Sequence, residues 1–106
     1  RDYIHISDLV EAHSLGINYL NINKGFNTFN LGSGKGTSVF EVIEMFQNIL
    51  EKKIPYIICK PRDGEVPEYF CNTSKALIQL KWQPKRGLKK MCSDAFFWSE
   101  RLKGLN

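Results

Sequence analysis

The glycine-rich turn with a lysine at residues 32–37, in the stretch FNLGSGKGTS, is the first candidate for phosphate chemistry. A Walker A loop requires a glycine, four residues and then Gly-Lys-Ser/Thr, so that successive backbone N–H groups surround the phosphates. Here Phe29 stands where the first glycine is required, and Gly36 stands where the hydroxyl residue is required. The dinucleotide fingerprint G-x-G-x-x-G also fails, because Thr37 holds its third glycine position. The turn is therefore interpreted as a strand-to-helix connection, with an ATP-binding loop as an alternative.

Two arginines lie where they could bind a diphosphate. Arg1 directly precedes a short apolar segment, and Arg62 begins a polar loop that continues Asp63-Gly64-Glu65. A planar guanidinium grips phosphate oxygens through parallel N–H donors, and two of them from different loops could clamp a diphosphate. On pattern alone, surface arginines or ion-pair partners are the simpler interpretation.

The other reactive side chains do not form a catalytic or metal-binding set. His5 and His13 have no convincing nucleophile beside them, so both are interpreted as structural. The three cysteines are far apart, without metal-ligand or C-x-x-C spacing, and their odd number argues against a disulfide framework. They are Cys59, Cys71 and Cys92. Free thiols favour a reducing, cytoplasmic location.

Several short elements must position these residues. Apolar spacing predicts helices after an N-cap at Ser7, from residue 39 to about 53, through residues 74–80, and over 88–102. Ser38 and Glu41 have the spacing of a capping box. Strands are predicted at residues 26–31 and 55–59, and residues 3–6 are predicted to be a strand or an extended entry to the first helix. The predicted fold class is α/β, a small unit of about four helices with a few short strands.

Composition limits the remaining choices. The 106 residues suffice for one small domain, and a net charge of +4 suits an anionic ligand without requiring nucleic acid. No stretch approaches the roughly twenty apolar residues of a membrane span. The chain begins at Arg1 inside what is already an ordered pattern, so we expect a fragment that would gain from packing on a partner.

Four stretches carry a resemblance along essentially the whole chain: RDYIHISDLVEAH, FNLGSGKGTSVFEVIEMF, IPYIICKPRDGEVPEYFCNTSKA and KWQPKRGLKKMCSDAFFW. Together they closely resemble the C-terminal part of the UDP-glucose 4-epimerase family, among the extended short-chain dehydrogenases/reductases. The R-D-Y-I-H start, the N-L-G-x-G turn and the R-x-G-[DE] loop are more specific together than any single motif. Other sugar-nucleotide epimerases and dehydratases share parts of the pattern and stay open as alternatives.

The resemblance implies a nucleotide-binding role for four positions. Those matching Arg1 and Arg62 hold the diphosphate of the UDP-sugar in the family. The position matching Tyr3 lies beside the nucleotide, and the one matching Val39 packs near the uracil. The glycine turn then belongs to the uridine pocket, and its lysine is not a P-loop lysine.

The resemblance also implies a ribose contact and a sugar-specificity position. Glu65 matches the acid that contacts the ribose hydroxyls, although aspartate is usual there. Pro61 stands where a second arginine is common, which leaves Arg62 without a neighbouring cation. Tyr69 matches the position whose bulk closes the sugar pocket against N-acetylated substrates, which implies UDP-glucose and UDP-galactose as substrates.

The family's reaction, epimerisation at sugar C4 through a 4-keto intermediate, requires NAD and residues that this chain lacks. It has no G-x-x-G-x-x-G turn, and its only Tyr-x-x-x-Lys spacing, Tyr56 with Lys60, falls in a predicted strand. We therefore expect a C-terminal UDP-sugar-binding segment over residues 1–106, with the NAD-binding Rossmann domain absent, no catalytic or metal residues, and no activity alone. The alternative is a separate interaction module that associates with itself through exposed apolar faces.

Overall fold

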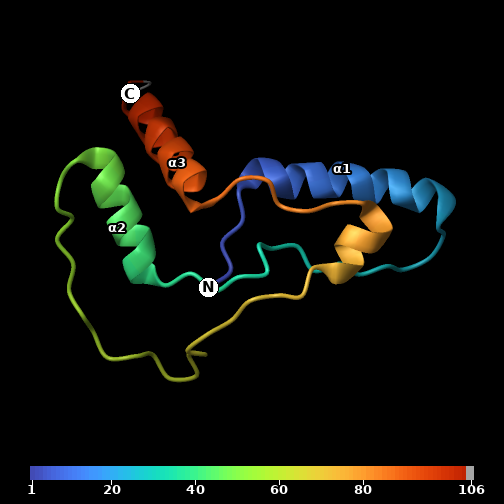
Figure 1. Ribbon diagram of the computed structural model, residues 1–106, viewed down its shortest axis with the longest axis horizontal. Coiled ribbons are helices and arrows are strands. Elements are labelled where there is room, and N and C mark those ends of the chain that lie inside the picture. Colours follow the sequence, from blue (N-terminus) through green and yellow to red (C-terminus); the bar gives the residue numbers. More distant parts are fainter. Residues whose placement is uncertain (105–106) are drawn as a thin grey trace.

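Four helices and long connecting segments make up the computed structural model, which describes residues 1–104 (Figure 1). The α-helices are α1 (Ile6–Ile22), α2 (Val39–Leu50) and α3 (Leu88–Lys103), and a short π-helix, η1 (Ala76–Leu80), lies between the last two. Helix α1 packs against η1, and α2 packs against α3. The helical periodicity of the sequence is therefore confirmed for all four segments. None of these helices is both long and apolar enough to cross a membrane.

The strand predictions were wrong for the part of the chain that the structure describes, and residues 3–5 form the extended entry to α1 that was the alternative there. Residues 1–104 contain no strand, and residue 6 already belongs to α1. The β-branched and aromatic residues of these segments have the side-chain preferences of strands, but a strand also needs a second segment with which to exchange backbone hydrogen bonds. One such exchange occurs, where the Thr37 N–H donates to the Arg1 carbonyl at 2.8 Å and the Arg1 nitrogen donates to the Thr37 carbonyl at 2.7 Å. A single pair is too short to form a sheet.

The start of α1 differs from the prediction by two residues. His5 caps the helix, and its Nδ1 accepts a hydrogen bond from the Ser7 N–H at 3.0 Å. The prediction that Ser7 is the N-cap was therefore wrong. An imidazole nitrogen replaces the usual hydroxyl oxygen as the acceptor for the unpaired N–H groups of the first turn.

The predicted capping box at the start of α2 is confirmed. Ser38 Oγ accepts from the Glu41 N–H at 3.1 Å, and Glu41 Oε2 accepts from the Ser38 N–H at 2.7 Å. The hydrogen bonds from Ser38 lower the pKa of the Glu41 carboxyl group. The helix ends at Leu50 because Glu51 adopts a left-handed conformation with φ of 52°, a little before the predicted end.

The core lies where α1 meets η1 and the segment after it. Its fully buried residues are Ala12, Ala76, Leu80 and Trp82. Trp82 is 1% exposed, and its indole N–H donates to the Asp8 carbonyl at 2.9 Å. The left-handed conformation of Lys81, with φ of 56°, ends η1 and turns the chain so that Trp82 packs beneath α1.

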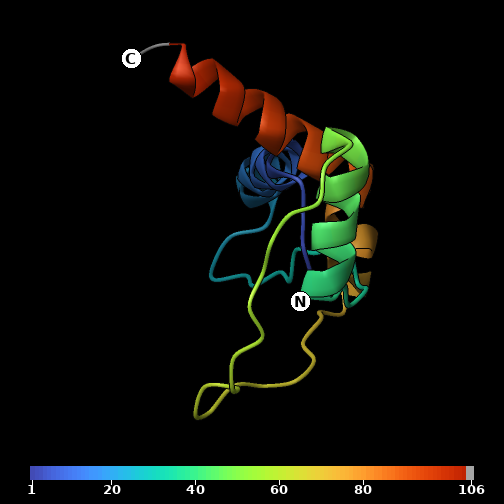
Figure 2. The ribbon, with the colours of Figure 1, turned by 90° about the vertical axis from the view of Figure 1, so that its left-hand side faces the viewer.

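Away from this core the molecule is open. Its radius of gyration is 17.0 Å, whereas a compact domain of this length has about 13 Å. Its accessible surface is 8613 Å², whereas a folded monomer of 12.2 kDa exposes about 6100 Å². The connection between α2 and η1 extends away from the helices (Figure 2). The aromatic residues Phe97 and Trp98 of α3 are 70% and 55% exposed.

Candidate functional site

Arg1 joins three segments that are distant in sequence. Its Nη1 donates to the Val66 carbonyl at 2.8 Å, and its Nη2 forms an ion pair with Glu65 Oε1 at 3.3 Å. Its backbone pairs with Thr37 at the end of the glycine turn. The guanidinium is therefore held in place by the loop around residue 65 while its side chain stays 41% exposed.

Glu65 connects Arg1 to the loop of the second predicted arginine. The Arg62 N–H donates to Glu65 Oε2 at 3.3 Å, and the Glu65 N–H donates to the Arg62 carbonyl at 3.1 Å. Gly64, with φ of +78°, allows this tight turn. The structure thus brings Arg1, Glu65 and the backbone of Arg62 together, and the Arg62 side chain is exposed.

The donors of the glycine turn surround a carboxylate of the chain itself. Asp2 Oδ1 accepts from the Ser33 N–H and hydroxyl, each at 2.6 Å. Asp2 Oδ2 accepts from the Gly34 N–H at 3.1 Å, the Cys71 N–H at 3.2 Å and the Cys71 thiol at 3.4 Å. Burial raises the pKa of Asp2, but the hydrogen bonds from Ser33 and Cys71 outweigh it and lower that pKa to about 2. The Asp2 carboxylate therefore occupies the anion-binding position formed by the donors of Ser33, Gly34 and Cys71.

This arrangement answers the question raised by the sequence of the turn. The N–H groups of Ser33 and Gly34, which a phosphate loop would direct at a nucleotide, already bind Asp2. A Cβ added at Gly32 would lie 2.5 Å from Asp2 Oδ2 and 2.6 Å from Cys71 Sγ, so only glycine fits there. These contacts argue against the ATP-binding alternative.

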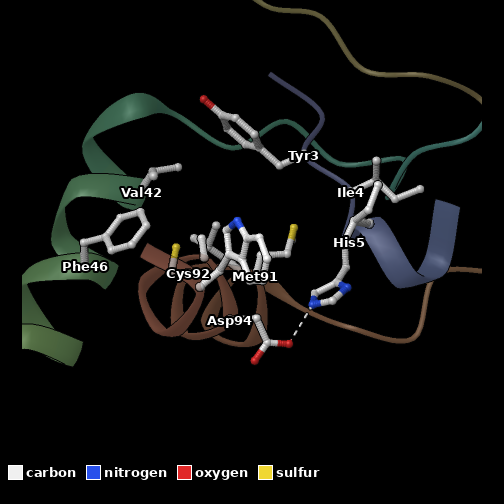
Figure 3. A pocket seen from close by; sticks show the side chains of 12 residues that line it. Tyr3, Ile4, His5, Val42, Phe46, Met91, Cys92 and Asp94 are labelled. Carbon is white, nitrogen blue, oxygen red and sulfur yellow. Dashed lines mark hydrogen bonds and ion pairs between the residues drawn. The ribbon is translucent and has the colours of Figure 1, made fainter. Parts of the chain in front are cut away.

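Tyr3 faces an apolar pocket of about 460 Å³ between the N-terminal segment, α2 and α3 (Figure 3). Val42 and Phe46 of α2 line one side of it, and Met91 and Cys92 of α3 line another. Burial raises the pKa of the Cys92 thiol, so this cysteine contributes to the lining as a neutral, apolar group.

His5 borders the same pocket in a structural role, as predicted. Its Nε2 lies 3.0 Å from Asp94 Oδ2, and Lys90 Nζ donates to Asp94 Oδ1 at 2.7 Å. Because His5 Nδ1 accepts from Ser7, a neutral His5 carries its proton on Nε2 and donates to Asp94. The hydrogen bond from Lys90 and then that from His5 lower the pKa of Asp94.

The other two predicted binding residues lie on the surface. Val39, the first residue of α2, is 62% exposed, and Tyr69, in the loop before η1, is 64% exposed. Neither side chain belongs to the hydrophobic core around Trp82. Within residues 1–104, no group of three or more His, Cys, Asp or Glu side chains could hold a metal ion.

Sequence reasoning missed two aspartates that organise the structure. Asp2 was overlooked although it lies between Arg1 and Tyr3. Asp8, which is fully buried, accepts from the N–H groups of Lys85 and Arg86 at 3.0 and 2.9 Å and pairs with the Arg86 guanidinium. An acidic residue in the first turn of a helix was the available signal for Asp8.

Comparison with solved structures identifies the class of protein. The whole chain aligns with 32% of a UDP-glucose-4-epimerase from Stenotrophomonas maltophila, solved with bound NAD and formylated UDP-arabinopyranose, at a TM-score of 0.94 and 35% identity. The chain thus has the structure of part of an epimerase of the short-chain dehydrogenase/reductase type.

Sequence comparison gives the same result. The chain is 38% identical over 98 residues to the UDP-glucose 4-epimerase of Bacillus subtilis (strain 168). The aligned region covers 92% of this chain and 29% of that enzyme. It is 39% identical over 102 residues to UDP-glucose 4-epimerase GEPI48 of Cyamopsis tetragonoloba, covering 95% of this chain and 29% of that enzyme. No family model matches. The chain spans about 29% of the length of these relatives, and its resemblance to a C-terminal part of UDP-glucose 4-epimerase is confirmed.

Proposed function

We propose that this chain is the substrate-binding part of a UDP-glucose 4-epimerase that interconverts UDP-glucose and UDP-galactose. The observation that carries the proposal is the match of the whole chain to the Stenotrophomonas enzyme, at a TM-score of 0.94 and 35% identity. That relative was solved with a UDP-sugar derivative, so a UDP-sugar is the substrate class we propose here.

We assign residues 1–106 to the C-terminal, UDP-sugar-binding segment and NAD binding to a separate N-terminal Rossmann domain. The described residues of this chain do not fit NAD, because the glycine turn at residues 32–37 holds Asp2, and Tyr56 and Lys60 lie on a non-helical segment. NAD in the complete enzyme supplies the hydride acceptor of the reaction.

The surface of the chain supports the assignment of a second domain. Its accessible area exceeds that of a compact domain of its mass by about 2500 Å². Many large apolar side chains contribute to this excess. They include Val10, Ile17 and Leu20 of α1, Leu77 and Ile78 of η1, and Phe97, Trp98 and Leu102 of α3. A packed Rossmann domain would remove these side chains from water.

In this proposal the diphosphate lies between Arg1 and Arg62. The two loops are already joined by Glu65, which orients the Arg1 guanidinium. A carboxylate has about four lone-pair sites, so Glu65 can accept from ribose hydroxyls while it keeps Arg1. The exposed side chain of Val39 is available to the uracil, Tyr3 lies beside the nucleotide, and Tyr69 closes the sugar pocket.

The three cysteines support a cytoplasmic location for the enzyme. All of them are free thiols in the structure. Thiols persist where the cell keeps them reduced, and disulfides are rare there.

The experiment that tests the function measures UDP binding by calorimetry in the complete enzyme. Arg1→Ala should weaken UDP binding at least tenfold, because a charge-assisted contact to phosphate is lost. Arg101→Ala, which removes an exposed arginine from the last turn of α3, should leave the affinity unchanged. The 106-residue chain with added NAD should not epimerise UDP-glucose. Equal affinity of the wild type and the Arg1 variant would refute the assigned site.

A second candidate, an interaction module that associates with itself, is favoured by the same exposed apolar area. It predicts that the 106-residue chain forms dimers or larger assemblies in light scattering. A stable monomer at high concentration would contradict it.

A further inference from the structure

We propose that Asp2 is the positioning residue of the UDP-sugar site: its carboxylate, bound in the glycine turn, fixes the relative positions of the three segments that carry the binding residues. This inference rests on the proposed function. Asp2 is assigned no contact with the ligand, and its effect is exerted through its neighbours.

Asp2 connects three segments of the chain. It lies between Arg1 and Tyr3 in sequence, so the hydrogen bonds of its carboxylate restrain the backbone that carries both. Oδ1 binds Ser33 through two hydrogen bonds of 2.6 Å, which fixes the turn that leads into α2. Oδ2 binds the Cys71 N–H at 3.2 Å, which fixes the end of the long loop.

Each of these segments carries a proposed ligand contact. The N-terminal segment carries Arg1 and Tyr3. The glycine turn is followed by α2, whose first residue is Val39. The loop that ends at Cys71 carries Tyr69 two residues earlier. One carboxylate therefore links the diphosphate, uracil and sugar parts of the site.

The hydrogen-bond donors around Asp2 closely fit an aspartate. Gly32 is buried and cannot accept a Cβ without contact with Asp2 and Cys71. Gly34 has φ of +71°, a conformation that suits glycine and directs its N–H to Oδ2 at 3.1 Å. All five donors face acceptor-only oxygens, so an amide at this position would direct its own N–H groups at other donors.

The positioning role of Asp2 is distinct from a general contribution to stability. Every residue of the long loop from 55 to 70 is exposed, and none of them belongs to the buried core. Hydrogen bonds connect this loop to the N-terminal segment at two places, from Arg1 to Glu65 and Val66 and between Asp2 and Cys71. Loss of the Asp2 contacts removes the connection at the end of the loop that carries Tyr69, whereas the contacts of Arg1 near residue 65 and the aromatic pair of Tyr56 with Phe40 remain.

The test compares Asp2→Asn with Asp8→Asn in the complete enzyme. Both variants replace a hydrogen-bonded aspartate by its isosteric amide, but the hydrogen bonds of Asp8 connect α1 to residues 85–86, away from the proposed site. UDP affinity is measured by calorimetry, kcat and KM for UDP-glucose by steady-state kinetics, and Tm by calorimetric melting.

We expect Asp2→Asn to raise the Kd for UDP about tenfold, which corresponds to about 1.4 kcal/mol. The KM for UDP-glucose should rise by a similar factor and kcat should change less than KM, because binding contacts are misplaced while the reacting groups belong to the other domain. Asp8→Asn should lower Tm and leave the Kd within about twofold. Ser33→Ala, which removes one of the two bonds to Oδ1, provides a milder variant with a smaller rise in Kd should Asp2→Asn fail to fold.

Three outcomes overturn the inference, and they can be told apart. A wild type that does not bind UDP refutes the proposed function and the positioning role with it. A wild type that binds UDP, with unchanged Kd in both Asp2→Asn and Ser33→Ala, refutes the positioning role alone. Equal rises in Kd for Asp2→Asn and Asp8→Asn show a general loss of stability and also refute it.

Discussion

Asp8→Asn is the substitution for which the structure gives the clearest expectation of stability. The Asp8 side chain has no exposed area, and its two oxygens accept from the backbone of Lys85 and Arg86 and from the Arg86 guanidinium. The amide keeps one oxygen as an acceptor, and its NH₂ group faces donors in place of the other. Two backbone N–H groups and a guanidinium then compete for a single neutral oxygen.

The expected loss of unfolding free energy in Asp8→Asn follows from the burial of Asp8 and of its partner Arg86. Removal of one member of a buried ion pair costs about 3–5 kcal/mol, because the other charge is left without compensation. Arg86 is 36% exposed, so its guanidinium can regain water and the cost falls to the lower end, about 3 kcal/mol. A small domain is stable by only about 5–15 kcal/mol, so the loss is a large fraction of the total.

The pH dependence of the same substitution provides an independent test. Burial raises the pKa of Asp8, but the hydrogen bonds from Arg86 and Lys85 and the charge of Arg86 outweigh it, so the folded-state pKa is lowered. A lowered folded-state pKa gives stability that is complete above the unfolded value, near pH 4, and is lost as the pH falls through the folded value. The difference in free energy of unfolding between wild type and Asp8→Asn should therefore be constant from pH 7 to 5 and should shrink below pH 4.

The assay is equilibrium unfolding in urea at pH 7, 5 and 3, followed by circular dichroism. Asp63→Asn removes an exposed carboxylate of the long loop and serves as a control that should change stability by less than about 0.5 kcal/mol. Two results would refute this role of Asp8. One is a loss of unfolding free energy below about 1 kcal/mol for Asp8→Asn at pH 7, and the other is a difference in free energy between wild type and variant that does not shrink in acid.

Three further predictions concern the site and the helix ends. Tyr69→Gly should allow the complete enzyme to epimerise UDP-N-acetylglucosamine with at least a tenfold gain in kcat/KM; no gain would refute the role of Tyr69 in specificity. The pKa of Asp2 is lowered from 3.8 to about 2, so the folded state gains about 2 kcal/mol above pH 4 and loses it between about pH 4 and 2. In unfolding curves measured over this pH range, Asp2→Asn should remove this acid dependence. Ser38→Ala should destabilise the protein by about 1 kcal/mol in urea unfolding through loss of the cap of α2, whereas Ser99→Ala, within α3, should not.

The helices could be predicted from the sequence because their determinants are local. Apolar residues at intervals of three and four located α2, and the Ser38 to Glu41 spacing located its first turn. The Ser7 prediction failed because His5, a residue rarely considered as a cap, presents Nδ1 to the same N–H group. The strands failed because pairing depends on a second segment, which no local pattern can supply.

The site was partly predictable for the same reason. Arg1 and Glu65 were selected through a resemblance in which both positions carry a role, and the structure joins them at 3.3 Å. Asp2 carries no local signal, because its partners lie 31 residues away at Ser33 and 69 residues away at Cys71. A side chain whose function is to hold distant backbone N–H groups can be recognised only after the chain has folded.

The glycine turn shows why a motif that nearly matches a phosphate loop need not bind phosphate. Successive backbone N–H groups in a glycine-rich turn attract any anion that fits, and the Asp2 carboxylate is always present at the turn. Because the Asp2 pKa is about 2, this anion stays charged at every pH at which the protein is expected to function. A diphosphate that approaches the chain finds these donors occupied by Asp2. For this reason the proposed UDP site depends on Arg1 and Arg62, and the turn contributes by keeping Arg1 in place.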